Sequence, residues 1–90
     1  MWEIKYTKRF LKELSKLPRD IRERAEKIVF KEIKDKNPFS LGYIERLKTS
    51  KDKYKIRIGD YRIGLKIDSK HKEIIFLRIA HRKDIYKMFP

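Results

Sequence analysis

Apolar and charged residues alternate over residues 2–6, at the start of the chain. A period of two predicts a β-strand with one buried face. Thr7 then caps a predicted helix over residues 7–17, in which four apolar residues lie on one side. The apolar residues are Trp2, Ile4 and Tyr6 in the strand, and Phe10, Leu11, Leu14 and Leu17 in the helix.

Pro18 ends this first helix and opens a second, where its missing N–H does no harm. The second helix continues to Asn37-Pro38, which stops it. Two helices joined at a proline, each with one apolar stripe, predict a helical hairpin packed on a sheet. The apolar positions of the second helix are Ile21, Ala25, Ile28, Val29 and Ile33.

Three strand-like segments fill most of the second half of the chain, over residues 54–58, 61–67 and 73–80. The last is apolar on both faces, so we expect it to lie inside the sheet. A loop with a short strand near residues 44–48 precedes them, and residues 81–90 predict a strand end followed by a short helix or tail. The outline is an α+β single domain over residues 1–90, with a mostly antiparallel sheet covered by the N-terminal helical hairpin.

Gly59-Asp60 fits a two-residue hairpin turn, with glycine at the first, positive-φ position. This turn would pair Arg57 with Arg62 and Lys55 with Gly64, although like charges directly opposite each other destabilise a sheet. We therefore expect a cationic strip that faces away from the core and binds a phosphodiester chain. The alternative is the ordinary solvent face of a basic protein. The strip consists of Lys55, Arg57, Arg62 and Lys66.

The charge of the chain adds to this picture, because 26 Lys and Arg residues against 13 Asp and Glu leave a formal net charge of +13. So large a charge favours a polyanionic partner such as RNA, DNA, the ribosome or an acidic protein, rather than a merely solvated Lys-rich surface. Cysteine is absent. No apolar run approaches the roughly 20 residues of a membrane span, and no signal-like stretch opens the chain. We therefore expect a cytoplasmic, soluble protein.

The tail adds groups that can carry out RNA cleavage. That reaction must deprotonate a 2′-hydroxyl, stabilise a phosphorane and protonate the leaving 5′-oxygen. The candidates are Lys55, Arg57, Arg62, His81, Arg82 and Tyr86. His81 could instead cap a helix, and Tyr86 could pack beside Ile85 and Phe89. The chemistry needs no metal, and we expect no metal or cofactor, since His71 and His81 are the only histidines and no Gly-rich phosphate loop exists.

Two stretches, "YKIRIGDYRIGLKI" and "RIAHRKDIYKMF", resemble the central hairpin and the last strand with its tail in the RelE/ParE superfamily of toxins, on its RelE side. The resemblance covers essentially the whole chain. It implies the toxin of a type II toxin–antitoxin pair, a ribosome-dependent endoribonuclease that cuts mRNA in the A site without metal. It also implies a cognate acidic RelB-like antitoxin, with which the toxin can form a heterotetramer.

By position, the resemblance assigns a catalytic lysine to Lys55 and the phosphate-stabilising arginine to Arg62. Arg82 matches the arginine at the end of the family's last strand, and Tyr86 approximates the tail tyrosine. Arg57 stands where the best-studied members of the family have a second lysine. Since arginine cannot act as a base, that role falls to Lys55, Tyr86 or His81. The interval from Arg82 to Tyr86 is shorter than in the best-known RelE toxin.

Two other functions remain open at this point. One is a ParE-like inhibitor of DNA gyrase on the same fold. The other is a non-catalytic RNA- or ribosome-binding module, which would share the charge but would not need Tyr86 or His81. In each case, affinity should fall steeply with salt as counterions are released.

Overall fold

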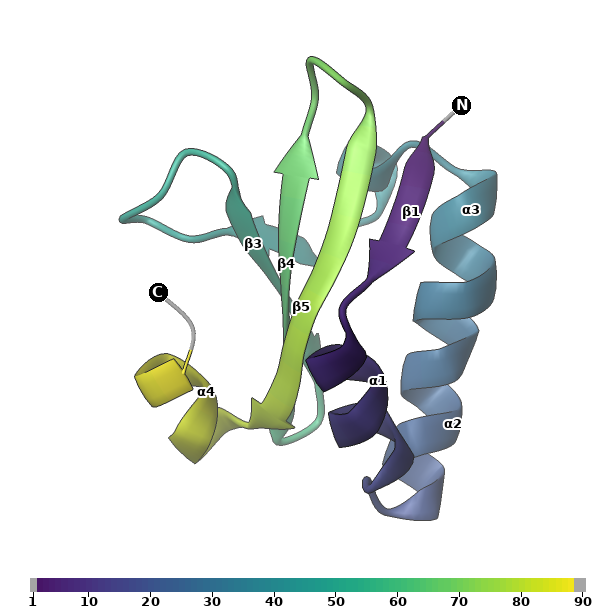
Figure 1. Cartoon of the computed structure of the whole chain (residues 1–90), viewed down its shortest axis with the longest axis vertical. Helices are drawn as coiled ribbons and strands as arrows, with labels where there is room; N and C mark the ends of the chain where they lie inside the picture. Colours follow the sequence, from purple (N-terminus) through teal and green to yellow (C-terminus); the bar gives the residue numbers. More distant parts are fainter. Residues whose placement is uncertain (1, 89–90) are drawn as a thin grey trace.

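One five-stranded sheet organises the computed structural model, which describes residues 2–88 (Figure 1). The strand order is β1-β5-β4-β3-β2, with β1 parallel to β5 and the other neighbours antiparallel. The strands are β1 (Glu3–Tyr6), β2 (Ile44–Arg46), β3 (Lys53–Ile58), β4 (Tyr61–Asp68) and β5 (Glu73–His81). The predicted α+β class is confirmed, and β5 has a neighbour on each side as expected.

The predicted helical hairpin is also present, and Thr7 caps its first helix by accepting a hydrogen bond at Oγ1 from the Phe10 N–H, at 3.0 Å. The second helix contains a π-helical turn that its spacing did not predict; there the Val29 carbonyl accepts a 2.6 Å hydrogen bond from the Tyr6 hydroxyl. The elements are α1 (Lys8–Ser15), α2 (Arg19–Lys27), η1 (Ile28–Glu32), α3 (Ile33–Asp35), η2 (Pro38–Ser40) and α4 (Arg82–Met88). The proposed packing partner Phe89 lies outside the described residues.

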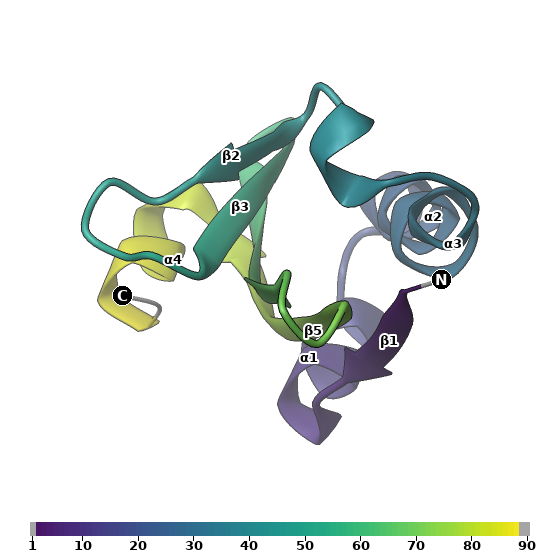
Figure 2. The same cartoon turned by 90° about the horizontal axis from the view of Figure 1, so that it is seen from above.

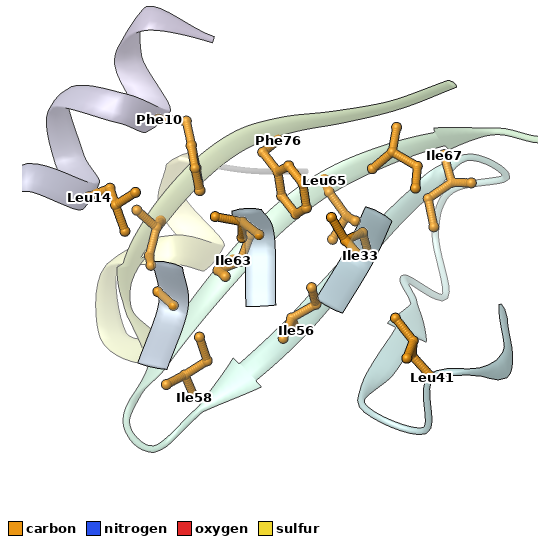
Figure 3. Close-up of a cluster of buried hydrophobic side chains, with 14 residues drawn as sticks. Phe10, Leu14, Ile33, Leu41, Ile56, Ile58, Ile63, Leu65, Ile67 and Phe76 are labelled. Carbon is orange, nitrogen blue, oxygen red and sulfur yellow. The ribbon is translucent and has the colours of Figure 1, made fainter. Parts of the chain in front are cut away.

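The core lies between the helical hairpin and one face of the sheet (Figure 3). Phe10 and Leu14 of α1 meet Phe76 and the buried isoleucines of β3, β4 and β5 there. Leu11, expected on the same side, is instead 42% exposed. Viewed from above, α4 lies on the other side of β3 and β4 from α2 and α3 (Figure 2). The helical hairpin therefore packs on one face of the sheet, and α4 packs on the other.

A β-bulge interrupts the pairing of β4 with β5. Gly64 pairs with Arg78 and Leu65 with Phe76, so that Leu77 has no partner. The bulge lets both Phe76 and Ile79 face the core, although strict alternation would separate them. Helix α1 and its capping residue satisfy the freed backbone groups: Thr7 donates to the Leu77 carbonyl at 3.0 Å, and Glu13 accepts from the Ile79 N–H at 3.1 Å.

The β3–β4 hairpin has the predicted register. Gly59 has φ +55°, so glycine is required at this first turn position. Arg57 pairs with Arg62 and Lys55 with Gly64. The two like-charged arginines are therefore neighbours in the sheet, and the face that they share lies under α4 rather than under the helical hairpin.

Candidate functional site

A pocket of about 370 Å³ opens between the hairpin and α4. Strand β2 and the loop after it form one wall, Lys55 and Arg62 form the floor, and α4 forms the opposite wall. Most of the lining side chains that carry charge are basic. The lining residues are Glu45, Arg46, Leu47, Lys48, Thr49, Lys55, Arg62, Ile85 and Tyr86.

Lys55 and Tyr86 are in contact inside this pocket. The Lys55 ammonium donates a hydrogen bond of 3.4 Å to the Tyr86 hydroxyl and lies 5.7 Å from the centre of its ring. Helix α4 brings the tyrosine here, because its Ile85 is only 3% exposed and holds the helix on the sheet. Tyr86 itself is 63% exposed, so its hydroxyl is open to a ligand.

Arg62 is buried, contrary to the expectation of a solvent-facing side chain. It is 7% exposed, because α4 covers the face of the sheet toward which it points. Its Nη1 donates to the Gly59 and Tyr61 carbonyls, each at 2.8 Å. These bonds fix the guanidinium at the edge of the pocket, and a buried cation held in this way is suited to bind an anion strongly.

Arg82 reaches the same hairpin turn from the other end of the chain. Its backbone N–H donates to the Asp60 carbonyl at 2.7 Å, and its Nε lies 4.0 Å from Asp60 Oδ1. Arg62 and Arg82 therefore flank one turn, although Arg82 does not line the pocket. Arg57 is exposed and is also absent from the lining.

His81 lies on the opposite face of the sheet from Arg62. It pairs with Tyr61, and the two rings lie 5.4 Å apart, whereas Arg62 pairs with Ala80. The His81 Nδ1 accepts a hydrogen bond from the Lys83 N–H at 3.2 Å, which caps the first turn of α4. Of the six candidate residues, the pocket thus brings together Lys55, Arg62 and Tyr86, and does not include Arg57, His81 or Arg82.

Sequence reasoning missed the wall formed by β2. Glu45 pairs with Lys55 and lines the pocket, so the cationic strip does have a carboxylate beside it. Arg46, Lys48 and Thr49 come from the same wall. The only sequence signal was the weak strand near residues 44–48, and which strand pairs with the hairpin is not a local property.

A second carboxylate balances the outer end of the strip. Asp52 lies 3.8 Å from Lys66 and 3.4 Å from Lys53. The pKa of Asp52 is lowered chiefly by a hydrogen bond from Ser50, and further by Lys53 and Lys66. Lys66 therefore has an ionised carboxylate as its salt-bridge partner, which distinguishes it from the other members of the cationic strip.

In the part of the chain that the structure describes, no three His, Asp or Glu side chains gather in a way that could hold a metal ion. Over the same residues, no helix combines the length and the apolar character needed to cross a membrane.

The chain matches known toxins over most of its length. Residues 4–86 match the family model described as the ParE toxin of the type II toxin–antitoxin system parDE. The chain is 36% identical over 90 residues to Toxin RelE3 of Methanocaldococcus jannaschii, covering 98% of this chain and 99% of the relative. It is 28% identical over 86 residues to Toxin RelG of Mycobacterium tuberculosis, covering 96% and 97%.

A solved structure has the same fold. The crystal structure of the RelB-RelE antitoxin–toxin complex from Methanococcus jannaschii contains a chain that superposes with a TM-score of 0.78. It is 37% identical in sequence, and the match covers 96% of this chain and 99% of that chain.

Proposed function

Because the chain belongs to the ParE toxin family of type II toxin–antitoxin systems, we propose that this toxin is a ribosome-dependent endoribonuclease that inhibits translation. It would cut mRNA in the ribosomal A site by attack of a 2′-hydroxyl on the neighbouring phosphate. The observation that carries the proposal is that Lys55, Arg62 and Tyr86, distant in sequence, line one pocket.

Arg62 and Lys55 supply the positive charge that the reaction needs. Attack by the 2′-oxygen adds negative charge to a phosphate that is already anionic, so fixed cations stabilise the transition state more than the ground state. Arg62 is suited to this role because its hydrogen bonds to Gly59 and Tyr61 set its position before the substrate binds. Arg46 and Lys48 extend the basic lining toward the adjoining phosphates.

Proton transfer in this mechanism involves Glu45, Lys55 and Tyr86. Among the described lining residues, Glu45 is the one carboxylate and can accept the 2′-hydroxyl proton. The new bond joins O2′ to phosphorus, the bond to O5′ breaks, and the 5′-oxygen takes a proton from Tyr86 or Lys55. The products are a 2′,3′-cyclic phosphate and a 5′-hydroxyl end. His81 has no part, because it lies on the other face of the sheet.

Translating ribosomes with a defined mRNA test the proposal. We expect the wild-type toxin to produce cuts at the A-site codon, mapped by primer extension, with cyclic phosphate ends. Arg62→Ala should abolish the cuts, whereas Lys70→Ala, which removes one charge from an exposed turn, should not. Because Arg62 is buried, the folded state of each variant is checked by circular dichroism. Intact mRNA in the presence of folded wild type would refute the proposal.

Inhibition of DNA gyrase is a second candidate, because the matching family model is that of ParE toxins. It predicts that supercoiling is inhibited in vitro while ribosome-bound mRNA stays intact. A third reading, a non-catalytic ribosome-binding module, predicts translation arrest that Tyr86→Phe leaves unchanged. Both assays use the same purified protein and separate the three functions.

A cognate RelB-like antitoxin is the proposed protein partner. The Methanococcus jannaschii relative was solved as a complex with RelB, and a net charge of +13 favours an acidic partner. Co-expression with the acidic protein of an adjacent reading frame should suppress cleavage and yield a complex, whose mass by light scattering would identify a heterotetramer. A neighbouring protein that does not bind the toxin would contradict this assignment.

A further inference from the structure

His81 joins the last strand of the sheet to the helix that carries Tyr86. It is the final residue of β5, and its backbone pairs with Tyr61 of β4. Its ring packs edge-on against the Tyr61 ring, with 5.4 Å between the two ring centres, on the face of the sheet opposite Arg62. Strand pairing and ring packing therefore hold the imidazole in place, and the side chain is only partly exposed.

The imidazole caps α4 from the end of the sheet. Its Nδ1 accepts a hydrogen bond of 3.2 Å from the Lys83 N–H, in the first turn of the helix. The first N–H groups of a helix have no partner within it, so such a bond stabilises the helix start. The Arg82 N–H makes a second bond of this kind, to the Asp60 carbonyl at 2.7 Å. A ring nitrogen that accepts carries no proton, so the proton of the neutral imidazole lies on Nε2.

The position of the Tyr86 hydroxyl depends on how α4 begins. Tyr86 follows Lys83 by three residues, so the two lie within one turn of the helix. Its side chain is 63% exposed, so its own packing does little to fix it beside Lys55. The backbone of α4 must therefore set where the hydroxyl lies. Ile85, at 3% exposed, fixes that backbone at one point, and one point leaves the direction of the helix free.

On the basis of the proposed function, we propose that His81 is a positioning residue for Tyr86. Ile85 docks α4 on the sheet, and the His81 cap holds the start of the helix at a second point, which sets its direction over the pocket. The Tyr86 hydroxyl then stays beside Lys55, where it can protonate the leaving 5′-oxygen. His81 does not line the pocket and touches no reacting atom.

The hydrogen bond at Nδ1 favours this role over the two others open to the histidine. A group that transfers a proton must reach the substrate, and His81 lies on the other face of the sheet from the pocket. A side chain that only packs would need the ring but not the nitrogen, whereas Nδ1 has a defined partner. The three roles therefore differ in which part of the side chain matters.

Two variants separate the nitrogen from the ring. His81→Phe keeps a ring against Tyr61 and removes the acceptor. His81→Asn removes the ring, but its Oδ1 occupies the same bond position as Nδ1, and Asn is among the best N-cap residues. On translating ribosomes, kcat should fall about twofold or more in His81→Phe with KM unchanged, because Tyr86 acts in the transition state. We expect His81→Asn to match the wild type.

Other outcomes of this comparison would overturn the proposal. A loss in His81→Asn but not in His81→Phe would show that the ring only packs. Equal losses in both variants would assign the imidazole a direct part in the reaction, and wild-type rates in both would leave it no part. Circular dichroism checks that each variant is folded.

Hydrogen exchange in the free toxin makes the same comparison without a substrate. The opening constant of the α4 amides should rise about fivefold in His81→Phe, the loss typical of an N-cap, and stay at the wild-type value in His81→Asn. The ¹⁵N shifts of the wild-type imidazole should show a bare Nδ1. Equal exchange in the two variants, or a proton on Nδ1 of the neutral ring, would overturn the proposal. If the wild type cleaves no mRNA, the proposed function fails, while exchange still decides whether His81 holds α4.

Discussion

Arg62 is the residue whose environment differs most from the one its sequence position predicts. Alternation correctly directs it away from the hydrophobic core, but α4 covers that face and leaves the side chain 7% exposed. The same long-range packing brings Tyr86 to Lys55. The place of Glu45 beside Lys55 depends on the pairing of β2 with β3, which the sequence did not predict. The chemistry of each residue could be inferred from the sequence, whereas their common pocket could not, because three distant segments form it.

Tyr86→Phe tests whether the pocket is catalytic. Because the side chain is 63% exposed, the change should leave unfolding stability nearly unaltered. If the hydroxyl transfers a proton, cleavage on ribosomes should slow by about 10²-fold or more. Tyr61→Phe, on the other face of the sheet, is the matched control and should cleave normally. Equal rates for both variants would show that the Tyr86 hydroxyl takes no part in the reaction.

Glu13→Gln tests the connection between α1 and the β-bulge. Glu13 accepts two hydrogen bonds from Arg78 Nε and one from Nη2, at 3.1, 3.0 and 2.7 Å, and another from the Ile79 N–H. Loss of the charge should lower the free energy of unfolding by about 1–3 kcal/mol. Glu23→Gln, which breaks only the exposed pair with Arg19, should cost about 0.5 kcal/mol or less. Urea titration of both variants measures the difference, and equal losses would contradict the assigned role.

Asp68 gives the turn between β4 and β5 a pH dependence. Its pKa is lowered chiefly by a hydrogen bond with the His71 side chain, and further by the His71 N–H. A group with a depressed folded-state pKa contributes stability above its unfolded pKa, about 3.9 for Asp. This contribution is lost as the pH falls through the folded-state value. The decline of Tm below about pH 4 should therefore be shallower in Asp68→Asn than in the wild type, and parallel curves would contradict this.

The helices and turns that could be predicted from the sequence are those fixed by residues within them or next to them in the chain. The β3–β4 turn follows from Gly59, which takes the positive φ that the turn requires, and α1 follows from its Thr7 cap. The bulge at Leu77 was not predictable, because its free backbone groups are satisfied by Thr7 and Glu13 from far along the chain. The π-helical turn η1 was not predictable from its spacing either, and its Val29 carbonyl accepts a hydrogen bond from Tyr6 of β1, which is distant in sequence.

Helix α1 offers a pair of substitutions with unequal expected effects. Lys8→Glu places an acid in the first turn and next to Lys12 at i+4, so stability should rise by about 0.3–1 kcal/mol. Lys16→Glu also removes a repulsion with Lys12, but it places the acid at the C-terminal cap, where the helix dipole opposes it, so the two effects should nearly cancel. The net charge is the same in the two variants. Thermal unfolding measured at low salt compares them directly, and equal shifts would show that net charge alone decides.

For the whole molecule, the net charge of +13 sets how stability responds to salt. Self-repulsion among the cations destabilises the compact state, and salt screens it as the Debye length falls below about 10 Å. Raising the NaCl concentration should therefore stabilise the protein, by on the order of 1 kcal/mol or about 4–8 °C in Tm. The rise should be smaller in the triple variant Lys8→Gln/Lys12→Gln/Lys16→Gln, which removes three exposed cations. A Tm that falls with added NaCl would show that attractive ion pairs outweigh the repulsion.

Helix α4 is held on the sheet by few contacts, so it should undock from the sheet more often than the rest of the fold opens. A helix of seven residues is too short to persist by itself in water, and among its described side chains only Ile85 is buried. Undocking it should cost far less than melting the sheet, so its amide protons should exchange with deuterium well before those of β4. Each release would remove one wall of the pocket and uncover Arg62, which its hydrogen bonds to Gly59 and Tyr61 hold in place, so any activity of the pocket should scale with the fraction of time that α4 is docked.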